Sequence, residues 1–499
     1  MDEHIRRAPA PPVRAGAERK RPRVVVVGGG FGGLEVAKGL AGADVDVVLI
    51  DRENHHCFQP LLYQVATAAL NPADVAWPVR RILRGQANVT VLMAEVTGVD
   101  TAGRVVVADG EQVAYDYLVL ATGSTHSYFG HPEWAEVAPG LKRIDDATDI
   151  RRRILEAFER AELTHDDAER QRLMTFIVVG GGPTGVELAG ALHELARLAM
   201  PLDFRRIDPR QARIILVEAG PRLLPTLPEH LSDYALATLQ RMGVEVRTGA
   251  AVTACDAAGV ELGEVCIPGG TLLWAAGVKA SPAAQWLGLE GDKAGRVKVA
   301  PDLTVPGQGE VFVIGDTASV KVGDQPVPGI APAAKQMGAY VARVIRARVA
   351  GAAAPGPFEY RHQGDLATIG RKSAVVKLGR TELTGFAGWL FWSVVHIYFL
   401  VGARHRIAVA FAWMWNYVTF QRDARLIVAR ERPGARHDPQ MPSALTPDGR
   451  PKSLTDNDFS TRTGPPPPGA PHPKPASGEG LGAPAQGPQG TGERERSPP

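Results

Sequence analysis

The chain has 499 residues, 44% of them hydrophobic, which is enough for two or three domains with cores of their own. A net charge of only +2 gives no electrostatic basis for binding nucleic acid. The three cysteines, Cys57, Cys255 and Cys266, are too few and too scattered for a disulfide framework or a zinc site, and no CxxC or CxxxxC pair occurs.

A disordered arm and then a strand–turn–helix unit are predicted at the start of the chain. Residues 1–22 combine Arg, Lys, Pro and acidic residues and lack the apolar region of a secretory signal. The β-branched run Val24–Val27 predicts a buried parallel strand, and the sequence Gly-Gly-Gly-Phe-Gly-Gly after it predicts a sharp turn into a helix. Gly28 permits the turn, Gly30 lets the backbone approach a pyrophosphate, and Gly33 lets the helix pack on the strand.

This unit predicts a dinucleotide site. Pyrophosphate oxygens would meet the free N–H groups and the positive end of the helix dipole. The next predicted strand, Val47–Asp51, ends in a carboxylate, Asp51, which would accept hydrogen bonds from ribose hydroxyls. After a later strand, Tyr117–Leu120, the small residues Thr122 and Gly123 would let the backbone pass close to the same nucleotide.

A second unit of the same kind is predicted after a linking helix over Thr148–Glu162. Phe176–Val179 is its strand, and the strand Ile214–Val217 is followed by the acid Glu218. The glycines equivalent to those of the first unit are Gly180, Gly182 and Gly185. A lone glycine motif can serve packing only, but two complete units predict two dinucleotides, and a chain that holds two usually passes electrons between them.

The first domain is predicted to resume after the second. Val311–Ile314 predicts a strand, Gly315 a turn, and Asp316 the start of a helix whose N-terminus would face a phosphate of FAD. The NADH-binding domain would then be an insertion in the FAD-binding domain. The expected boundaries are 1–22 for the arm, 23–145 and 286–350 for the FAD domain, 146–172 for a linker helix, 173–285 for the NADH domain, 356–430 for a membrane-anchoring region and 431–499 for a tail.

The membrane-anchoring region is predicted from charge and aromatic content. Between Arg371 and Arg430, Lys and Arg outnumber acidic residues nine to two. Gly385–Val401 is about 17 residues long, at the short limit for a membrane span, and a second aromatic stretch covers Ile407–Phe420. Core helices, one transmembrane helix and interfacial helices are the three interpretations, and the length and basic flanks favour interfacial amphipathic helices.

The tail, residues 431–499, is rich in Pro, Gly, Ser and charged residues. Such a composition buries too little apolar surface to offset the entropy of ordering, so we expect disorder. A proline-binding partner is the alternative interpretation of its polyproline run.

The motifs resemble those of the type II NADH:quinone oxidoreductases, a family of two-dinucleotide-binding flavoproteins. The match lies in His56–Thr67 (HCFQPLLYQVAT), Gly180–Gly190, Trp274–Val278 and Val313–Asp316. The most discriminating part is Phe58–Gln64 (FQPLLYQ), within the first of these motifs. The similarity covers about Arg23 to Ile427. It implies an α/β fold with two Rossmann-like domains and a C-terminal amphipathic helical region that anchors the protein to a membrane.

The resemblance implies transfer of a hydride from NADH to non-covalent FAD, then of two electrons to ubiquinone or menaquinone, without proton pumping. We expect peripheral attachment to the cytoplasmic face of a bacterial inner membrane, with a homodimer as an open possibility. The expected FAD-site residues are Gly28, Gly30, Phe31, Gly32, Gly33, Asp51, Arg52, Gln59, Thr122, Gly123, Gly315, Asp316, Lys335 and Gln336. The expected NADH-site residues are Gly180, Gly182, Pro183, Thr184, Gly185, Glu187, Glu218, Ala276 and Gly277.

Two carboxylates of the second unit have expected roles. Glu218 would repel a 2′-phosphate and so favour NADH over NADPH, with Arg222 near enough in sequence to soften the preference. Glu187 is placed in the first turn of its helix, where a carboxylate is favoured by the dipole alone. The resemblance implies that Glu187 instead lies beside nicotinamide and flavin and acts in protonation of the quinone.

The quinone side departs from the family pattern. A family helix often has the sequence Ala-Gln-x-x-x-Gln, whose first glutamine borders the quinone. Here Pro332 replaces that glutamine and Gln336 keeps the second, so the helical backbone is expected to persist while one side-chain hydrogen bond is lost. Lys335 is a candidate substitute donor, and we expect Glu187, Lys335 and Gln336 to be the catalytic residues.

Other functions remain as alternatives. A flavin-dependent reductase of a soluble iron–sulfur protein needs no aromatic C-terminus, and a sulfide:quinone reductase needs a cysteine pair near the flavin. A flavoprotein resembling apoptosis-inducing factor would bind nucleotide to control protein partners. Cys57 is interpreted as a small buried hydrophobe, and His55, His56, His396 and His405 as solvated or packed histidines with no metal site expected.

Overall fold

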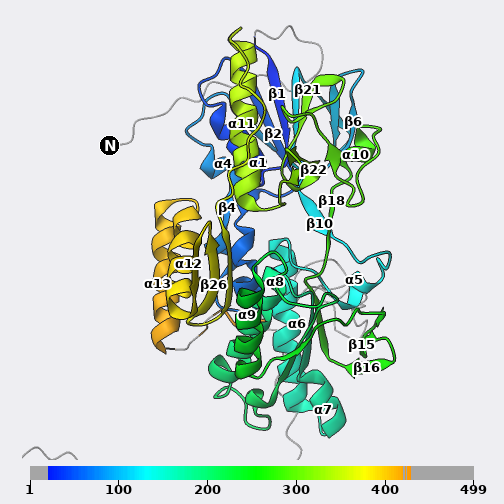
Figure 1. Ribbon diagram of the computed structural model, residues 1–499, viewed down its shortest axis with the longest axis vertical. Helices are drawn as coiled ribbons and strands as arrows, with labels where there is room; N and C mark the ends of the chain where they lie inside the picture. Colours follow the sequence, from blue (N-terminus) through cyan, green and yellow to red (C-terminus); the bar gives the residue numbers. More distant parts are fainter. Residues whose placement is uncertain (1–20, 420–421, 423, 429–499) are drawn as a thin grey trace, which may run out of the picture. The chain divides into compact units, whose positions relative to one another are not determined.

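The computed structural model describes residues 21–419, 422 and 424–428, so the predicted arm up to residue 20 and the tail lie outside the described residues. The first sheet has six strands in the order β20-β21-β9-β1-β2-β5. Its central strand β1, Arg23–Val27, is buried at every residue, as expected for a parallel strand covered on both faces. Strand β21, Gln308–Val313, pairs in parallel with β9 although the whole second domain separates them in sequence (Figure 1).

The second sheet has the order β13-β12-β11-β17, and its neighbouring strands are parallel. Each fingerprint strand leads directly into a helix, β1 into α1 (Phe31–Gly39) and β11 (Thr175–Val179) into α8 (Pro183–Glu194). The predicted linking helix is α6, Ile144–Leu163. The fold class is therefore confirmed: two Rossmann-like units, the second inserted in the first.

The bounds of the remaining elements before α8 are as follows. They are β2 Asp46–Asp51, β3 His55–Cys57, η1 Gln59–Leu61, α2 Leu62–Ala66, α3 Pro72–Val75, β4 Ala76–Pro78, α4 Val79–Ile82, β5 Val89–Met93, β6 Val96–Asp100, β7 Val105–Ala108, β8 Glu111–Ala114, β9 Tyr117–Leu120, β10 Ser124–His126, α5 Trp134–Val137 and α7 Asp167–Leu173.

The elements that follow α8 complete the second domain and the return to the first. They are η2 Leu195–Ala199, η3 Pro209–Gln211, β12 Arg213–Val217, α9 Glu229–Met242, β13 Glu245–Arg247, β14 Ala254–Cys255, β15 Gly259–Leu262, β16 Val265–Pro268, β17 Thr271–Trp274, β18 Val278–Ala280, α10 Ala283–Trp286, β19 Val297–Lys298, β20 Thr304–Val305, η4 Gly315–Thr317, β22 Ala318–Ser319, β23 Lys321–Val322, β24 Gln325–Pro326 and α11 Ala331–Val349.

The prediction that Asp316 opens a helix is wrong. Gly315–Thr317 forms a single 3-10 turn, and the chain then continues as strand β22, which pairs with β19. The helix begins only at Ala331, where Pro332 lies in the first turn as expected. Its residue Gly338 packs against the first fingerprint, because a Cβ there would lie 2.3 Å from the Gly32 carbonyl oxygen.

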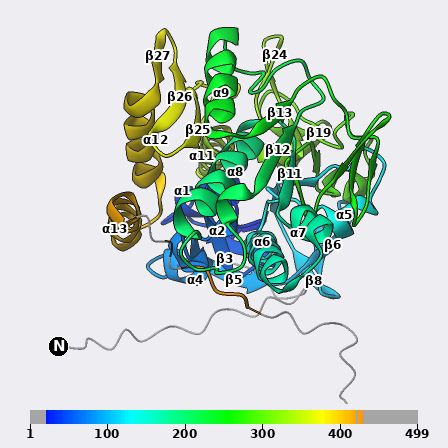
Figure 2. The same cartoon turned by 90° about the horizontal axis from the view of Figure 1, so that it is seen from below.

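The C-terminal region contains a sheet that the sequence did not predict. Strands β25 (Asp365–Gly370), β26 (Ser373–Leu378) and β27 (Thr381–Thr384) form an antiparallel meander. Helix α12, Gly385–Phe399, packs on β26, and helix α13, Ala403–Thr419, lies beside α12 in both ribbon views (Figures 1 and 2). Within the described residues no helix combines the length and apolar character that a membrane crossing needs.

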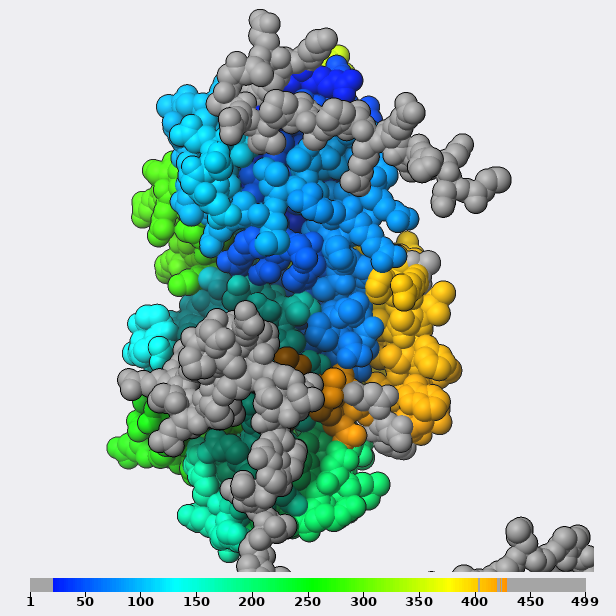
Figure 3. All heavy atoms as spheres, turned by 180° about the vertical axis from the view of Figure 1, so that it is seen from behind, coloured from blue at the N-terminus to red at the C-terminus, as the bar shows by residue number. Residues whose placement is uncertain are grey.

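Both C-terminal helices present a row of exposed apolar side chains. On α12 the exposed residues recur every fourth position, and on α13 every third or fourth, which places each set on one helix face. The opposite face of α12 is also apolar and includes Trp392, which is only 2% exposed. Figure 3 shows the helices, in yellow and orange, at the molecular surface. The exposed residues are Phe386, Leu390, Val394 and Tyr398 on α12 and Ile407, Phe411, Met414, Trp415 and Val418 on α13.

Candidate active site

The two glycine turns have the same backbone geometry. Gly28 has φ +103° and Gly180 has φ +114°, in the region that side chains disfavour. A Cβ at Gly28 would lie 2.4 Å from the carbonyl oxygen of Ala121, and one at Gly180 would lie 2.7 Å from that of Ala275. Each turn therefore passes directly against the end of the neighbouring strand.

The other fingerprint glycines separate into two kinds. A Cβ at Gly33 or Gly185 would lie 1.9 or 1.8 Å from the carbonyl oxygen of the first glycine of its own turn, so both positions need glycine for packing. By contrast, a Cβ at Gly30 or Gly182 would meet no protein atom within 4 Å. Open space at these N-caps of α1 and α8 fits a pyrophosphate at each helix N-terminus. Phe31, Gly32, Pro183 and Thr184 lie within the first turns of the two helices.

The two acids at the strand ends are held alike. Asp51 Oδ2 accepts from Gly29 N at 2.5 Å, and Glu218 Oε2 accepts from Gly181 N at 2.5 Å. The second oxygen of each carboxylate accepts another backbone N–H, that of Glu53 at 2.7 Å and that of Gly220 at 2.6 Å. Each carboxylate is thus oriented beside its glycine turn, where a ribose would lie.

Arg222 is not directed toward Glu218. Its guanidinium donates to the carbonyl oxygens of Leu227 at 3.1 Å and Pro225 at 3.0 Å, within its own loop. These bonds give no support to the expectation that Arg222 softens the preference for NADH.

The remaining predicted FAD residues form one polar cluster and several outlying positions. Asp316 accepts a hydrogen bond from Ser124 at 2.8 Å, and Thr317 donates to the Gly123 carbonyl at 3.1 Å. The Thr122 and Ser281 hydroxyls lie 2.5 Å apart. Gly315 turns with φ +70°. Arg52 and Gln59 are exposed.

Gly277, a predicted NADH residue after Ala276, lies beneath an aromatic ring. Gly277 has φ +68°, which disfavours a side chain, and a Cβ there would approach Phe129 Cζ at 2.6 Å. Phe129 itself has φ +52° and is 67% exposed. Strands β10 and β18, which flank this contact, pair with each other and join the two domains.

His56 and Cys57 are packed, as predicted. His56 Nδ1–H donates to the Gly29 carbonyl at 2.9 Å, and burial lowers the pKa of His56 to about 4. Burial likewise raises the pKa of Cys57 to about 12, so the thiol stays protonated at neutral pH. A neutral imidazole here supports the first glycine turn.

Lys335 and Gln336 occupy the first turns of α11, but they do not point together. The Lys335 ammonium lies 5.1 Å from the ring centroid of Phe399, at the end of α12. The Gln336 amide makes two backbone bonds with Arg361, donating to its carbonyl and accepting from its N–H, both at 2.9 Å. The loop between α11 and β25 therefore takes up most of the hydrogen bonds that the Gln336 amide can make.

Glu187 lies in the second turn of α8, not in the first as predicted. The helix begins already at Pro183, so Glu187 is its fifth residue and lies beyond the strongest part of the dipole. The residue is 9% exposed, and among the described residues its carboxyl has one hydrogen bond, from Thr368 N, which is long at 3.4 Å. Burial raises the pKa of Glu187 to about 8, so at neutral pH it is mostly protonated.

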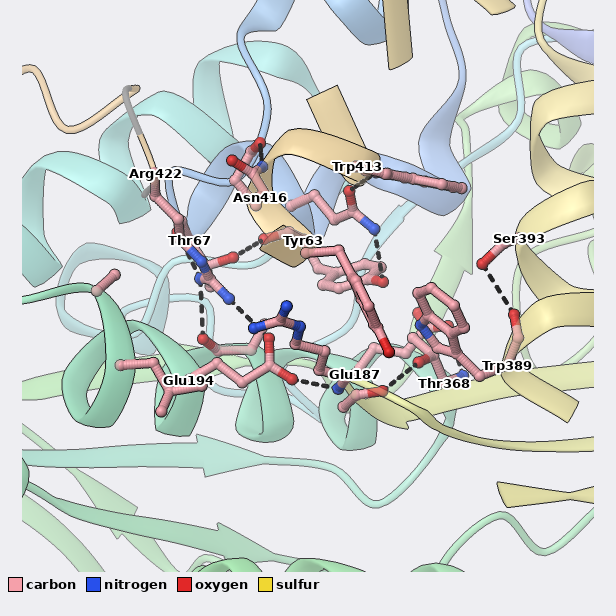
Figure 4. A pocket seen from close by; sticks show the side chains of 18 of the residues that line it. Tyr63, Thr67, Glu187, Glu194, Thr368, Trp389, Ser393, Trp413, Asn416 and Arg422 are labelled. Atoms are coloured by element: carbon pink, nitrogen blue, oxygen red, sulfur yellow. Dashed lines mark hydrogen bonds and ion pairs between the residues drawn. The ribbon is translucent and has the colours of Figure 1, made fainter. Parts of the chain in front are cut away.

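A pocket opens beside Glu187 between three parts of the chain. Its walls come from α2, from α8 and from the C-terminal elements β25, α12 and α13. Figure 4 shows Glu187 and Thr368 together, with Tyr63, Trp389 and Trp413 around them. The lining combines aromatic and small apolar residues with nearly as many polar and charged ones: Tyr63, Gln64, Thr67, Ala69, Glu187, Ala191, Glu194, Leu198, Ala199, Thr368, Gly370, Arg371, Trp389, Trp392, Ser393, Trp413, Asn416, Tyr417 and Arg422.

A buried ion pair fastens the C-terminal segment to this pocket. Arg422 Nη2 lies 2.9 Å from Glu194 Oε2, and the Arg422 side chain is only 10% exposed. The same guanidinium donates to the Thr67 and Ala191 carbonyls at 2.9 and 3.1 Å. Arg371 N donates to the other Glu194 oxygen. Glu194 thus ties two C-terminal segments to α8 and closes one end of the pocket.

The sequence prediction omitted most of these pocket residues. Tyr63, Gln64 and Thr67 belong to the first of the matching motifs, yet they were not given a role. The sequence favours a membrane interface for the aromatic stretches Gly385–Val401 and Ile407–Phe420, but three of their tryptophans, Trp389, Trp392 and Trp413, line the pocket. The signal that distinguishes the two sets is helical spacing, since the exposed face of α12 recurs at 386, 390, 394 and 398.

Comparison with known proteins agrees with this arrangement. Residues 22–338 match a family model described as pyridine nucleotide-disulphide oxidoreductase, and residues 362–423 match one described as NDH2 C-terminal domain. The chain is 46% identical over 418 residues to a type II NADH:quinone oxidoreductase of Mycobacterium tuberculosis, covering 81% of this chain and 89% of that protein. It is 30% identical to one from Staphylococcus haemolyticus, covering 73% and 92%.

Solved structures show the same fold. NDH2 from Plasmodium falciparum in complex with NADH superimposes with a TM-score of 0.74 at 21% identity, covering 82% of this chain and 100% of that chain. A sulfide:quinone oxidoreductase from Aquifex aeolicus superimposes with a TM-score of 0.60 at 18% identity, covering 82% and 96%. The paired nucleotide turns, the buried carboxyl at the pocket and the sequence identities lead to one conclusion. The chain belongs to the type II NADH:quinone oxidoreductase family.

Proposed function

We propose that FAD is the flavin of this NADH:quinone oxidoreductase, that NADH docks at the second glycine turn, and that the quinone ring enters the pocket beside Glu187. One observation carries this proposal: a pocket rich in aromatic residues is walled by α2 of the first domain, by α8 of the second and by the C-terminal elements, and has the buried carboxyl of Glu187 in its wall. When bound, FAD supplies the chemistry that accepts a hydride and passes on two electrons.

The residues that would hold the two nucleotides follow from the shared geometry of the two glycine turns and their strand-end carboxylates. The α1 N-terminus and Asp51 would hold the adenosine diphosphate part of FAD, with Asp316 and Thr122 toward the rest of the molecule. The α8 N-terminus and Glu218 would hold NADH. Because Glu218 is a fixed negative charge, a 2′-phosphate would be repelled there, which supports NADH as the substrate.

Glu187 is suited to hold a proton for the quinone. A reduced quinone takes up two protons, and a carboxyl with a pKa of about 8 carries its proton at neutral pH. The long bond from Thr368 N leaves the second carboxyl oxygen, Oε2, without a hydrogen bond to the described residues. Glu187 therefore combines the protonation state and the position of a proton donor.

The exposed apolar rows of α12 and α13 support attachment to a membrane surface. Each fully inserted large side chain contributes ~1.5–3 kcal/mol, so a few suffice for stable binding. Arg404 and Arg406, at the start of α13, are exposed beside these rows, where they would meet anionic headgroups. We propose a peripheral attachment to the cytoplasmic face of the inner membrane through this surface.

Steady-state assays with three donor–acceptor pairs test the proposed reaction. Electron transfer by the purified protein is measured from NADH to a short-chain quinone, from NADH to a ferredoxin, and from sulfide to a short-chain quinone. We expect rapid turnover with NADH and quinone only. Rapid ferredoxin reduction with slow quinone reduction would assign the chain to the soluble iron–sulfur reductases instead.

A flotation assay tests the membrane proposal. The full chain is mixed with vesicles containing anionic lipid, and a variant with Leu390→Ser and Val394→Ser is the comparison. We expect the unaltered chain to float with the vesicles and the variant to remain at the bottom. Equal flotation of both would contradict attachment through α12.

A further inference from the structure

A chain of hydrogen bonds connects α13 to the wall of the pocket. Trp413 Nε1–H donates to Gln64 Oε1 at 2.7 Å. Gln64 Nε2–H then donates to the Tyr63 hydroxyl oxygen at 2.9 Å. Figure 4 shows Tyr63 and Trp413 on the same side of the pocket, with the dashed bonds between them. These residues come from two segments almost 350 positions apart in the sequence.

The direction of this chain follows from chemistry. An indole N–H is only a donor, so the Gln64 group that faces Trp413 must be the carbonyl oxygen. The amide nitrogen of Gln64 therefore faces Tyr63 and donates to its oxygen. A hydroxyl that accepts there must direct its own hydrogen elsewhere.

The Tyr63 hydrogen is available to the pocket. Tyr63 is 6% exposed and lines the pocket with Glu187, and among the described residues its hydroxyl has no hydrogen-bond acceptor. Burial and the nearby Glu187 carboxyl raise the pKa of Tyr63, so the phenol keeps its proton at working pH. A buried donor without a partner costs free energy unless a ligand satisfies it.

We propose that Tyr63 is a catalytic residue that donates a hydrogen bond to a carbonyl oxygen of the quinone, and that Gln64 and Trp413 are positioning residues that hold its hydroxyl in this orientation. The inference rests on the proposed quinone pocket and assigns a donor within it. Tyr63 keeps its proton throughout; it stabilises the negative charge that develops on the quinone oxygen as electrons arrive. The docking of α13 thereby controls the donor.

Tyr63→Phe is the direct test, measured in two half-reactions by stopped flow. Reduction of the bound flavin by NADH should be unchanged, and reoxidation by a short-chain quinone should slow about tenfold, as expected for the loss of one hydrogen bond in a desolvated site. Tyr234→Phe is the matched control, because Tyr234 lies on α9 outside the pocket, with its hydroxyl 3.3 Å from Ser373 Oγ of β26. Unchanged reoxidation in Tyr63→Phe would overturn the proposal.

Gln64→Glu tests the direction of the hydrogen bonds that run from Trp413 through Gln64 to Tyr63. A carboxylate at position 64 has no donor, so Tyr63 would donate to it and turn away from the quinone. We expect the same tenfold loss as in Tyr63→Phe and no further loss when the two changes are combined, with recovery at low pH as the new carboxyl protonates. Additive losses would show that Gln64 does not act through Tyr63.

Trp413→Phe keeps an aromatic ring and removes only the N–H. It should slow reoxidation by about two- to threefold, because the Gln64 amide can then rotate, and should have no effect in a Tyr63→Phe background. If Trp413→Phe slowed reoxidation as much in the Tyr63→Phe background, Trp413 would not act through Tyr63.

A separate variant distinguishes an error in the role given to Tyr63 from an error in the assignment of the pocket as the quinone site. Ala69→Trp would fill the pocket, which Ala69 lines. Loss of quinone reoxidation in Ala69→Trp, with Tyr63→Phe unaffected, would keep the pocket and reject Tyr63. Normal reoxidation in Ala69→Trp, with flavin content unchanged, would reject the pocket itself. Quenching of tryptophan fluorescence by a quinone analogue reports binding independently of turnover.

Discussion

The nucleotide turns and the quinone pocket are built in opposite ways. Each nucleotide turn is completed by the acid at the end of the following strand of its sheet, and the groups satisfy one another: the Asp51 and Glu218 carboxylates accept two backbone N–H groups each. The pocket is lined by side chains from segments that are distant in the sequence, and some of its polar groups make few hydrogen bonds. Among the described residues, the Glu187 carboxyl accepts a single bond of 3.4 Å. Satisfied groups bind and orient; unsatisfied buried groups are poised for a substrate.

The comparison extends along helix α8. Glu187 and Glu194 lie two turns apart, and both line the pocket. Glu194 is neutralised by Arg422 and by a backbone N–H, which makes it a fastening point. Glu187 has no cation partner among the described residues, and burial therefore keeps its proton on. The same residue type on one helix thus has a structural role at one end and a chemical role at the other.

Breaking the first nucleotide turn should have the largest effect. Gly33→Val places side-chain atoms against the Gly28 carbonyl, where even a Cβ would lie 1.9 Å away. We expect protein purified without flavin, measured by absorbance at 450 nm. Gly98→Val is the control, since no atom lies within 4 Å of a Cβ there. Full flavin content in Gly33→Val would contradict the packing role.

Breaking the buried ion pair should have the next largest effect. Arg422→Met leaves Glu194 uncompensated, and loss of one partner of a buried pair costs about 3–5 kcal/mol of unfolding free energy. Arg425→Met is the matched control, because its partner Asp203 is 43% exposed and such pairs contribute under about 1 kcal/mol. Chemical denaturation measures the free energy of unfolding of both variants. Equal losses would show that the Arg422–Glu194 pair contributes no more than the more exposed Arg425–Asp203 pair.

Glu187→Gln should separate chemistry from binding. We expect flavin content to be retained and quinone turnover to fall by about a hundredfold, the usual contribution of a proton donor. In the unaltered enzyme the quinone half-reaction should decline above pH 8, because Glu187 loses its proton there, whereas the variant should show no such decline. Turnover that matches the unaltered enzyme at every pH would exclude Glu187 from the mechanism.

The same substitution has a stability signature. The folded chain holds the Glu187 proton up to a pKa of about 8, and the unfolded chain releases it above about 4.5. Rising pH between these values therefore favours the unfolded state, so stability contributed by the protonated form is lost as pH rises. The stability of Glu187→Gln relative to the unaltered chain should increase from pH 5 to pH 8 in denaturation experiments. A constant difference would show that the carboxyl is not buried.

The smallest expected effect concerns the choice of nucleotide. Glu218→Gln keeps the acceptor oxygen and removes the charge, so the ratio of kcat/KM for NADH to that for NADPH should fall several-fold. Arg222→Met should leave this ratio unchanged, because Arg222 is bonded within its own loop. A fall in the ratio with Arg222→Met would show that the loop rearranges around the nucleotide.

Local sequence was sufficient where the residue type itself carries the constraint. The glycine spacing at positions 28–33 and 180–185 predicts a strand, a turn and a helix because the turn needs positive φ at Gly28 and Gly180 and leaves no room for a side chain at Gly33 and Gly185. The helix predicted at Asp316 failed because Ala318–Ser319 pairs with Val297–Lys298, a tertiary contact that outweighs the local preference. The β25–β27 meander was missed because its short strands follow no clear alternation.

The sequence by itself determined the two nucleotide units, their order and the acid that completes each one, because the positive φ and the close approaches at each turn require glycine, and this requirement is visible in the residue type. Only the tertiary structure decided which aromatic residues of α12 and α13 face the pocket and which face outward. It alone placed Trp413 against Gln64 and Arg422 against Glu194. The physical reason is that burial and hydrogen-bond direction depend on partners hundreds of residues away, and these set the pKa of Glu187 and the orientation of Tyr63.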